Sequence, residues 1–433
     1  MLTVLTRTLT GAFRVPELRK KLLFTLGVIA LFRLGQLMPS PGVDVVAVRE
    51  CVGAARGGFF DMVQMLSGGA MLQLSVFALG VMPYITASII MQLFAVLVPR
   101  LDALRKEGQR GQAKITQYTR YLTVGIAVLN AGTVVALARA GQLLPGCTRP
   151  LLRDEGLLAV TVVVMTMVAG ACVVMWLGEL ITDRGIGNGM SLLMFTQVVA
   201  VFPGYMAKIF VMSPISFVVM TAAGLCLVAA VVFVEQAQRR IPVQYAKRMV
   251  GRRMYGGSST YIPLKVNQAG IVPVIFTSSL LYLPTLAAPL LGDAGQAWVE
   301  RNLASGTGPL YMSVYVLLIV GFAYFYVSIT FNPVEVADNM RRYGGFVPGI
   351  RPGGPTARYL AYVLGRLTAP GAVYLAVLAL LPLVAFAILK DPSTQQNFPF
   401  GGTSVLIMVG VGLDTVKQIE AQLQQRNYEG FLK

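Results

Sequence analysis

The side chains that most often carry out chemistry in proteins are sparse in this sequence. It contains no histidine, which excludes a histidine metal site and a Ser-His triad. Its four cysteines show no close pair with metal-ligand spacing: Cys51, Cys147, Cys172 and Cys226. The sequence therefore predicts neither a metal nor a cofactor. Cys51 and Cys147 both fall in segments predicted to lie outside the membrane, which leaves a disulfide between them open.

Three glycine-rich segments could resemble phosphate cradles: GIGNG (185–189), GDAG (292–295) and FGGTS (400–404). None has the strand and helix that flank a nucleotide site, and no Walker motif is present. GIGNG fits a turn between two helices, because glycine accepts the left-handed conformation. We therefore predict no catalytic activity, and any energy must come from a partner.

Ion-coupled transport would need carboxylates near the middle of a membrane span. Those near predicted spans lie at or close to span ends: Glu155, Glu179, Asp183, Glu235, Glu335 and Asp414. Arg33 falls inside a span, where it could also extend towards the head groups. This distribution disfavours a proton- or sodium-driven transporter.

The elements that must position these residues are membrane helices. The chain is 55% hydrophobic and 13% charged, with a mean hydropathy of +0.68, which is typical of an integral membrane protein. Hydropathy predicts ten spans in one membrane domain covering residues 1–433, without a cleavable signal peptide. They lie near residues 20–38, 73–98, 114–138, 155–177, 188–207, 213–235, 268–291, 308–331, 367–389 and 403–422.

Basic residues predict the orientation of these spans. With the N-terminus inside, 27 of the 36 Lys and Arg residues fall in cytoplasmic segments, so both termini are predicted to be cytoplasmic. Two cytoplasmic loops, near residues 236–266 and 332–366, are richly basic and suit an acidic partner. Before the second span, FFDMVQMLSGG (59–69) is a helix-like stretch of about half the length needed to cross a bilayer.

Several long motifs, in one order along the chain, resemble the SecY family, the central subunit of the bacterial protein-conducting channel. The first half contributes FRLG and PSPGVD (32–44), SGGA with FALGVMPYITASIIMQL (67–93), KEGQRGQAKITQYTRY (106–121) and WLGELITDRGIGNGMS (176–191). The second contributes QRRIPVQYAKR and GRRMY (238–255), PLKVNQAGIVPVIF (263–276), FNPVEVADNM and FVPGIRPG (331–353), and FGGTSVLI (400–407).

The resemblance implies an all-α polytopic fold of ten helices in two pseudosymmetric halves, residues 1–207 and 208–433. It also implies a channel that translocates unfolded polypeptides and releases hydrophobic segments sideways into lipid. A secondary transporter for a small solute and a ribosome-recruiting membrane scaffold are the alternatives.

The resemblance further implies an apolar pore ring. Val81 and Ile85, and likewise Met190 and Met194, are four residues apart and share one helix face. On spacing alone such pairs are more often ordinary core. The family's pattern makes them ring positions, and Ile275 and Ile407 complete the six. A flexible apolar ring offers a passing chain no hydrogen bonds and excludes water when empty.

The second and seventh spans are implied to form a lateral gate, with the third and eighth behind them. Weak polar contacts are expected at its seam, from Thr86, Ser88, Gln92, Gln117, Asn267, Thr277, Ser278 and Ser279. Pro83 and Pro273 are expected to bend the two gate helices. The stretch 59–69 becomes the plug, with Phe60, Asp61, Met62, Gln64, Met65, Ser67, Gly68 and Gly69, and the two glycines form its hinge.

The resemblance also implies partners at the cytoplasmic face. The docking residues for the ribosome and the SecA ATPase are Arg239, Arg240, Lys247, Arg248, Arg252, Arg253 and Arg351. Arginines can pair with ribosomal RNA phosphates and with acidic patches on proteins. The small subunits SecE and SecG, ribosomal protein, signal peptides, nascent chains and lipids are the other expected partners. The expected location is the cytoplasmic (inner) membrane.

Overall fold

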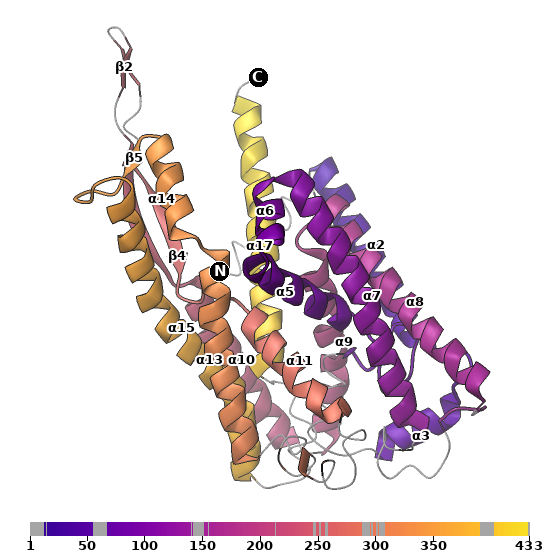
Figure 1. Cartoon of the computed structure of the whole chain (residues 1–433). Coiled ribbons are helices and arrows are strands. Elements are labelled where there is room, and N and C mark those ends of the chain that lie inside the picture. Colours follow the sequence, from indigo (N-terminus) through magenta and orange to yellow (C-terminus); the bar gives the residue numbers. More distant parts are fainter. Residues whose placement is uncertain are drawn as a thin grey trace.

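The computed structural model covers the 433-residue chain, and the residues that it describes form an elongated, mostly helical molecule (Figure 1). The described residues are 13, 15–54, 67–139, 141, 151–154, 156–212, 214–245, 248–250, 253–255, 259–287, 295, 298–299, 302, 308–389 and 402–431.

One helix overlaps each of the ten predicted spans. They are α2 (Pro16–Leu37), α5 (Met82–Leu97), α7 (Gln109–Arg139), α8 (Leu157–Arg184), α9 (Gly189–Met212), α10 (Pro214–Gln236), α11 (Val272–Ala287), α13 (Pro309–Thr330), α15 (Gly354–Leu389) and α17 (Gly402–Phe431). Six helices in the described parts of the chain are long and apolar enough to cross a membrane singly. A seventh such unit is the pair α5 and α6 (Pro99–Lys106), which bends by 99°.

The second span differs from its prediction at its start. Helix α5 begins only at Met82, although the hydropathy window begins at residue 73. The chain before it forms turns, because Leu74 and Gly80 take left-handed conformations with φ of 47° and 55°. The backbone N–H of Ser40 bonds the Leu74 carbonyl (3.0 Å), which ties these turns to the chain after α2.

The two prolines expected to bend the gate helices lie at helix starts instead. Pro83 is the second residue of α5 and Pro273 the second of α11. Proline fits the first turn because its missing N–H has no helical acceptor there. Pro284 is the proline inside α11.

Buried side chains divide the described helices into two packed groups. One apolar cluster joins α7 and α8 with the turns before α5 and with α3 (Val45–Ala54). A second joins α10, α11, α13, α15 and α17. A third contains residues of α2, α8 and α9 together with α11 and α17, so it lies where the groups meet. The boundary expected after residue 207 falls inside α9, and the division into two pseudosymmetric halves stays a prediction.

The two basic loops contain strands, which an all-α prediction missed. Strands β4 (Ser259–Lys265), β1 (Gln238–Tyr245) and β5 (Gly345–Phe346) form an antiparallel sheet in that order. Strands β2 (Arg248–Val250) and β3 (Arg253–Tyr255) form a separate hairpin. Ile241 and Val243 of β1 alternate with exposed residues and pack, with Met340 of α14 (Pro333–Arg342), into one cluster. The two loops are therefore one structural unit, which we call the docking sheet.

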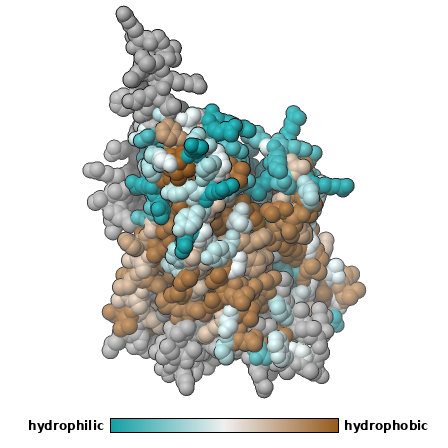
Figure 2. All heavy atoms as spheres, turned by 60° about the vertical axis from the view of Figure 1, so that its left-hand side comes forward, coloured by the Kyte–Doolittle hydropathy of each residue, from teal (hydrophilic) through white to brown (hydrophobic). Residues whose placement is uncertain are grey.

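The surface follows the membrane pattern. The docking sheet, α6 and the C-terminal end of α17 lie at one end of the molecule, and α3 lies at the other (Figure 1). Between the ends, a broad apolar band replaces the polar surface of the sheet end (Figure 2). Exposed side chains such as Leu129, Phe233 and Leu317 are suited to lipid.

The end that carries α3 also carries a disulfide. Cys51 in α3 is disulfide-bonded, whereas Cys172 and Cys226 have free thiols. Cys147, the remaining cysteine, lies outside the described residues.

The Asp44 carboxylate caps α3 by accepting hydrogen bonds from the backbone N–H groups of Val46 (3.0 Å) and Ala47 (3.3 Å).

Candidate functional site

The six residues expected to form the ring come together in the structure. Five are buried in the cluster at the meeting of the two helix groups, and the sixth, Ile85, is partly buried and packs against it: Val81, Met190, Met194, Ile275 and Ile407, with Ile85. They come from the start of α5 and from α9, α11 and α17, which lie far apart in the sequence. Ile407 is fully buried and Val81 is 1% exposed. The arrangement is an apolar cluster built from four segments, at the place where the constriction is expected.

Local geometry explains how these side chains reach one another. Val81 is the N-cap of α5, and its carbonyl accepts the backbone N–H of Ile85 (3.2 Å), so the two share one face. Met190 lies against α8 at Gly178, where an added Cβ would be 2.5 Å from the methionine Sδ. Glycine at position 178 therefore lets α8 and α9 approach closely.

A cavity of about 430 Å³ adjoins the constriction. Ile85, Met190, Met194 and Ile275 line one part of it, and polar groups of α5, α7, α8 and α9 line the rest. In the polar part the Arg120 guanidinium donates two hydrogen bonds to the Glu179 carboxylate, of 2.9 and 2.7 Å, and so links α7 to α8. This two-bond geometry fixes the position of both side chains.

The polar residues expected at the gate seam bond elsewhere. Ser278 donates to the carbonyl of Val274 in its own helix (2.9 Å), and its hydroxyl also lies 3.4 Å from that of Tyr315 in α13. Thr277 bonds the Pro273 carbonyl (2.8 Å). Within single helices, the Gln92 amide donates to Ser88 (3.4 Å) and the Gln117 amide to Tyr121 (2.9 Å). These hydrogen bonds stay within single helices or reach α13, and the role of these side chains at the gate seam stays a prediction.

Serine and threonine hydroxyls readily bond the carbonyl four residues earlier in a helix, and this local bond competes with a bond across the seam. Thr86 is a half-buried residue of α5, and the side chain of Ser279 lies outside the described residues.

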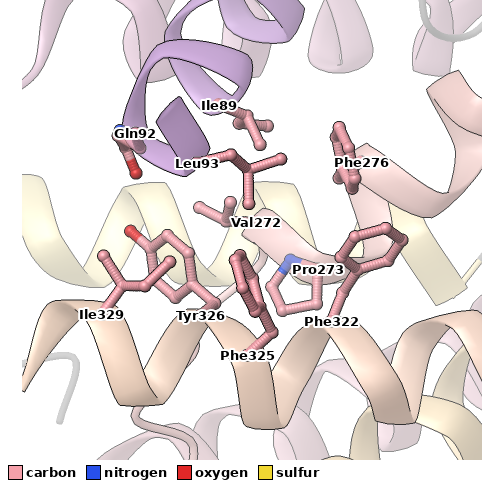
Figure 3. Close-up of a pocket in the computed structure, with 10 residues that line it drawn as sticks. All are labelled: Ile89, Gln92, Leu93, Val272, Pro273, Phe276, Phe322, Phe325, Tyr326 and Ile329. Carbon is pink, nitrogen blue, oxygen red and sulfur yellow. The ribbon is translucent and has the colours of Figure 1, made fainter. Parts of the chain in front are cut away.

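Apolar and aromatic side chains meet where α5, α11 and α13 come together. Figure 3 shows α5, α11 and α13 meeting around a small cavity of about 20 Å³, with Ile89 and Leu93 facing Phe276 and Phe322. The rings of Phe276 and Phe322 make an edge-to-face contact with centroids 4.2 Å apart. Sequence reasoning missed these residues. The signal was present in α13, where Phe322, Phe325, Tyr326 and Ile329 follow a helical apolar spacing.

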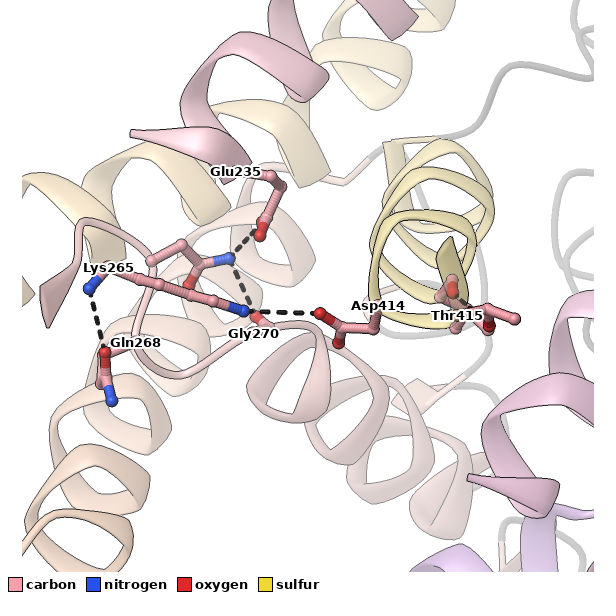
Figure 4. A network of polar contacts seen from close by, with 8 residues as sticks. Glu235, Lys265, Gln268, Gly270, Asp414 and Thr415 are labelled. Atoms are coloured by element: carbon pink, nitrogen blue, oxygen red, sulfur yellow. Dashed lines mark hydrogen bonds and ion pairs between the residues drawn. The ribbon is translucent and has the colours of Figure 1, made fainter. Parts of the chain in front are cut away.

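Asn267, expected at the gate, belongs to a polar network between the docking sheet and α11 (Figure 4). Its amide donates to the Glu235 carboxylate at the end of α10 (2.6 Å) and to the Gly270 carbonyl (3.2 Å). The neighbouring Lys265 ammonium lies 3.4 Å from the Asp414 carboxylate of α17. The sequence predicts only that the carboxylates of Glu235 and Asp414 lie near span ends, and not which groups they bond.

The predicted docking residues lie on the docking sheet or beside it. Arg239 and Arg240 are exposed on β1, and the Arg240 guanidinium lies 4.8 Å from the ring centre of Tyr261. Arg351 is exposed in the turn before α15, where its carbonyl accepts the Thr356 hydroxyl (2.8 Å). Arg248 and Arg253 are described only as strand residues, and Lys247 and Arg252 lie outside the described residues.

The plug is described only at its C-terminal end. Phe60, Asp61, Met62, Gln64 and Met65 lie outside the described residues. Gly68 and Gly69 have φ of 65° and 84°, which suits the expected hinge.

The hinge contacts α2 through a bonded pair of side chains. The Gln36 amide donates to the carbonyl of Ser67 (3.3 Å), and Arg33 donates to Gln36 (2.6 Å). Arg33 is therefore held beside the hinge.

Comparison with known proteins identifies the family. The family model described as SecY matches residues 75–416, which is more than half of the chain. The protein translocase subunit SecY of Streptomyces scabiei is 59% identical, with 100% of each chain covered. The corresponding subunit of Mycobacterium tuberculosis is 55% identical, over 98% of this chain and 99% of that one.

The fold is similar to that of solved channels. A structure of a protein conducting channel matches with a TM-score of 0.64 and 20% identity, covering 93% of this chain and 91% of that one. Sec61 in the canine ribosome-channel complex matches with a TM-score of 0.60 and 19% identity, with the same coverage. At these identities the likeness establishes the polytopic fold, whereas the family model and the much closer relatives establish kinship: the chain belongs to the SecY family.

Proposed function

We propose that this protein-conducting channel moves unfolded polypeptides through the constriction formed by its six ring residues. The observation that carries the proposal is their convergence from four distant segments into one buried apolar cluster. Channels can gate by apolar constrictions that exclude water. Methionine at positions 190 and 194 adds flexible side chains that can deform around a varied chain. The protein is a channel subunit and not an enzyme.

Lateral release of apolar segments is proposed to occur between α5 and α11. The support is that Ile89, Leu93 and Phe276 of these two helices line one small, largely apolar cavity. An apolar seam can exchange its contacts for those of an apolar segment without leaving polar groups unpaired. Signal peptides, and the apolar segments of nascent chains that enter the lipid bilayer, are therefore suited to this route.

The docking sheet is proposed to bind the ribosome during synthesis and the SecA ATPase during export. The support is its exposed arginines and the pairing of β1 with β5, which joins both basic loops. Arginine suits ribosomal RNA phosphates and protein carboxylates alike. SecE and SecG complete the proposed complex, in the inner membrane with both chain termini in the cytoplasm.

The test is site-specific photo-crosslinking to a stalled secretory precursor. A crosslinker at Ile275 should capture the precursor, because this side chain belongs to the constriction. The matched control is Val274, its neighbour, which is equally buried but belongs to another cluster. Capture at Ile275 and not at Val274 supports the pore. Equal capture at both, or none at Ile275, contradicts it.

A further inference from the structure

The segment that connects the docking sheet to α11 is held by neighbouring elements at three points, along its length or at its start. Strand β4 ends at Lys265 and α11 begins at Val272, so residues 266–271 are the direct covalent link between sheet and gate. The Val266 backbone N–H bonds the Ala237 carbonyl (3.0 Å), which extends the pairing of β4 with β1. The link therefore starts as a continuation of the sheet.

The first restraint is a buried hydrogen bond to α10. Asn267 is 3% exposed and Glu235 is 9% exposed, and their bond measures 2.6 Å. A second bond from the same amide to the Gly270 carbonyl keeps the link in a tight turn, where Gly270 has a φ of 63°. Hydrogen bonds to a charged group are strong when water is excluded. Asn267 is therefore a fixed point.

The second restraint is close packing against α15. Gly371 lies beside the link, and a Cβ at this position would be 2.5 Å from the Val266 carbonyl oxygen. No side chain fits between α15 and the link without displacing one of them. This contact supports the link on one side along its backbone.

The third restraint is an ion pair of a different character. The Lys265 ammonium and the Asp414 carboxylate are 3.4 Å apart, and their side chains are 41% and 62% exposed. Figure 4 shows Lys265 reaching from the end of β4 across to α17. Exposed pairs are weak and are screened by salt. This restraint can be released without exposing a buried polar group.

The ion pair joins the end of strand β4 to α17, a helix that carries a ring residue. Asp414 follows Ile407 by seven residues, or about two turns, so both lie on nearly the same face of α17. On α11, Ile275 follows Lys265 by ten residues and lies in the same apolar cluster as Ile407. The pair therefore ties the strand that leads into α11 to α17.

We propose that residues 266–271, which we call the lever, transmit the binding of a partner at the docking sheet to the seam between α5 and α11. The Asn267–Glu235 bond is its pivot, and the Lys265–Asp414 pair is the restraint that a partner bound to the docking sheet releases. Release frees the start of α11 to move away from α5. The proposal rests on the proposed docking and gate functions and adds the residues that couple them.

The test measures closure of the gate in the full-length channel. Cysteines replace Ile89 of α5 and Phe276 of α11, which line one cavity, and Cys172 and Cys226 are replaced by serine. Disulfide yield under mild oxidation then reports the closed state. Lys265→Met should lower the ratio of closed to open channel that this yield reports by about two- to fivefold, the range expected for loss of an exposed pair. The charge swap Lys265→Asp with Asp414→Lys should restore it.

The matched control removes a comparable pair elsewhere. Lys106→Met breaks the exposed pair with Asp102 (2.7 Å), which lies within α6, and should leave the yield unchanged. Raising the salt from about 0.05 to about 0.5 M should lower the yield in the parent channel and not in Lys265→Met. Equal yields in the parent channel, Lys265→Met and Lys106→Met overturn the lever.

Precursor crosslinking at Ile275 distinguishes failure of the lever from failure of the proposed channel function. If Ile275 still captures a precursor while Lys265→Met leaves the yield unchanged, the lever is wrong and the channel proposal stands. If Ile275 captures no precursor, the proposed function itself fails.

Discussion

At the scale of single residues, the constriction depends on side chains that offer no hydrogen bonds. Ile275 is 4% exposed in a cluster of aliphatic and methionine side chains. A polar group there would either bind water or be buried without a hydrogen-bond partner. Burying an unpaired amide costs about 1–3 kcal/mol in proteins. The closed constriction is therefore sensitive to polarity more than to shape.

Ile275→Asn should raise the resting ion conductance of reconstituted channels. The asparagine amide favours a hydrated constriction, and a preference of about 1–3 kcal/mol corresponds to about 5- to 150-fold in the population of the wet state. Conductance across planar bilayers measures the effect. Ile275→Leu is the control, since it keeps the apolar surface. A leak as large in the leucine variant would show that packing, and not polarity, closes the ring.

At the scale of elements, the type of a residue does not predict which neighbouring element its side chain bonds. The spacing of Val81 with Ile85, and of Met190 with Met194, was readable from the sequence, whereas the family resemblance alone made them and the other two residues ring positions. The partners of Ser278 and Asn267 were not readable, because a hydroxyl or amide can bond its own helix, a neighbour or water with similar ease. Only the positions of α10 and α13 show that these side chains turn away from α5.

The two bonds of the polar network should differ in their effect on stability. Asn267→Ala leaves the buried Glu235 carboxylate without its amide donor, which costs about 1–3 kcal/mol, or about 1–3 °C in the melting temperature. Lys265→Met removes an exposed pair and should shift melting by about 1 °C or less. Thermal unfolding of the purified channel in detergent measures both.

Glu235→Gln is the matched control for the buried bond, because glutamine keeps a carbonyl oxygen that the Asn267 amide can reach. It should melt closer to the parent protein than Asn267→Ala does. A melting temperature as low as that of Asn267→Ala would assign the stability to the charge and not to the hydrogen bond.

At the scale of the whole molecule, hydropathy predicted the spans because lipid imposes long apolar helices on any chain that crosses it. It could not predict the start of α5, since left-handed residues such as Leu74 and Gly80 interrupt a helix without changing the hydropathy. Nor did it reveal the docking sheet. The pairing of Gln244 with Phe346 joins segments about a hundred residues apart, which local sequence does not encode.

The docking sheet makes a prediction for the assembled translocase. Arg351→Glu should reduce SecA-dependent translocation into vesicles about tenfold or more, because a like charge at a docking contact costs several kcal/mol. The turn itself should persist, since Thr356 bonds the backbone carbonyl of residue 351. Arg358→Glu, an equal charge change at an exposed position of α15, is the control. Equal losses in both variants would indicate a general charge effect.

The last prediction concerns two seals in series. The proposed plug hinge is held by the bond from Gln36 to the Ser67 carbonyl, whereas the proposed ring residues belong to other segments and lie in or against an apolar cluster. Deleting residues 61–68 should therefore raise the resting ion permeability and leave precursor translocation intact, because the ring remains. Combining the deletion with Ile275→Asn should raise the permeability beyond either change alone, because each seal then leaks independently. Permeability of the double variant no greater than that of Ile275→Asn would mean that the plug adds no seal of its own.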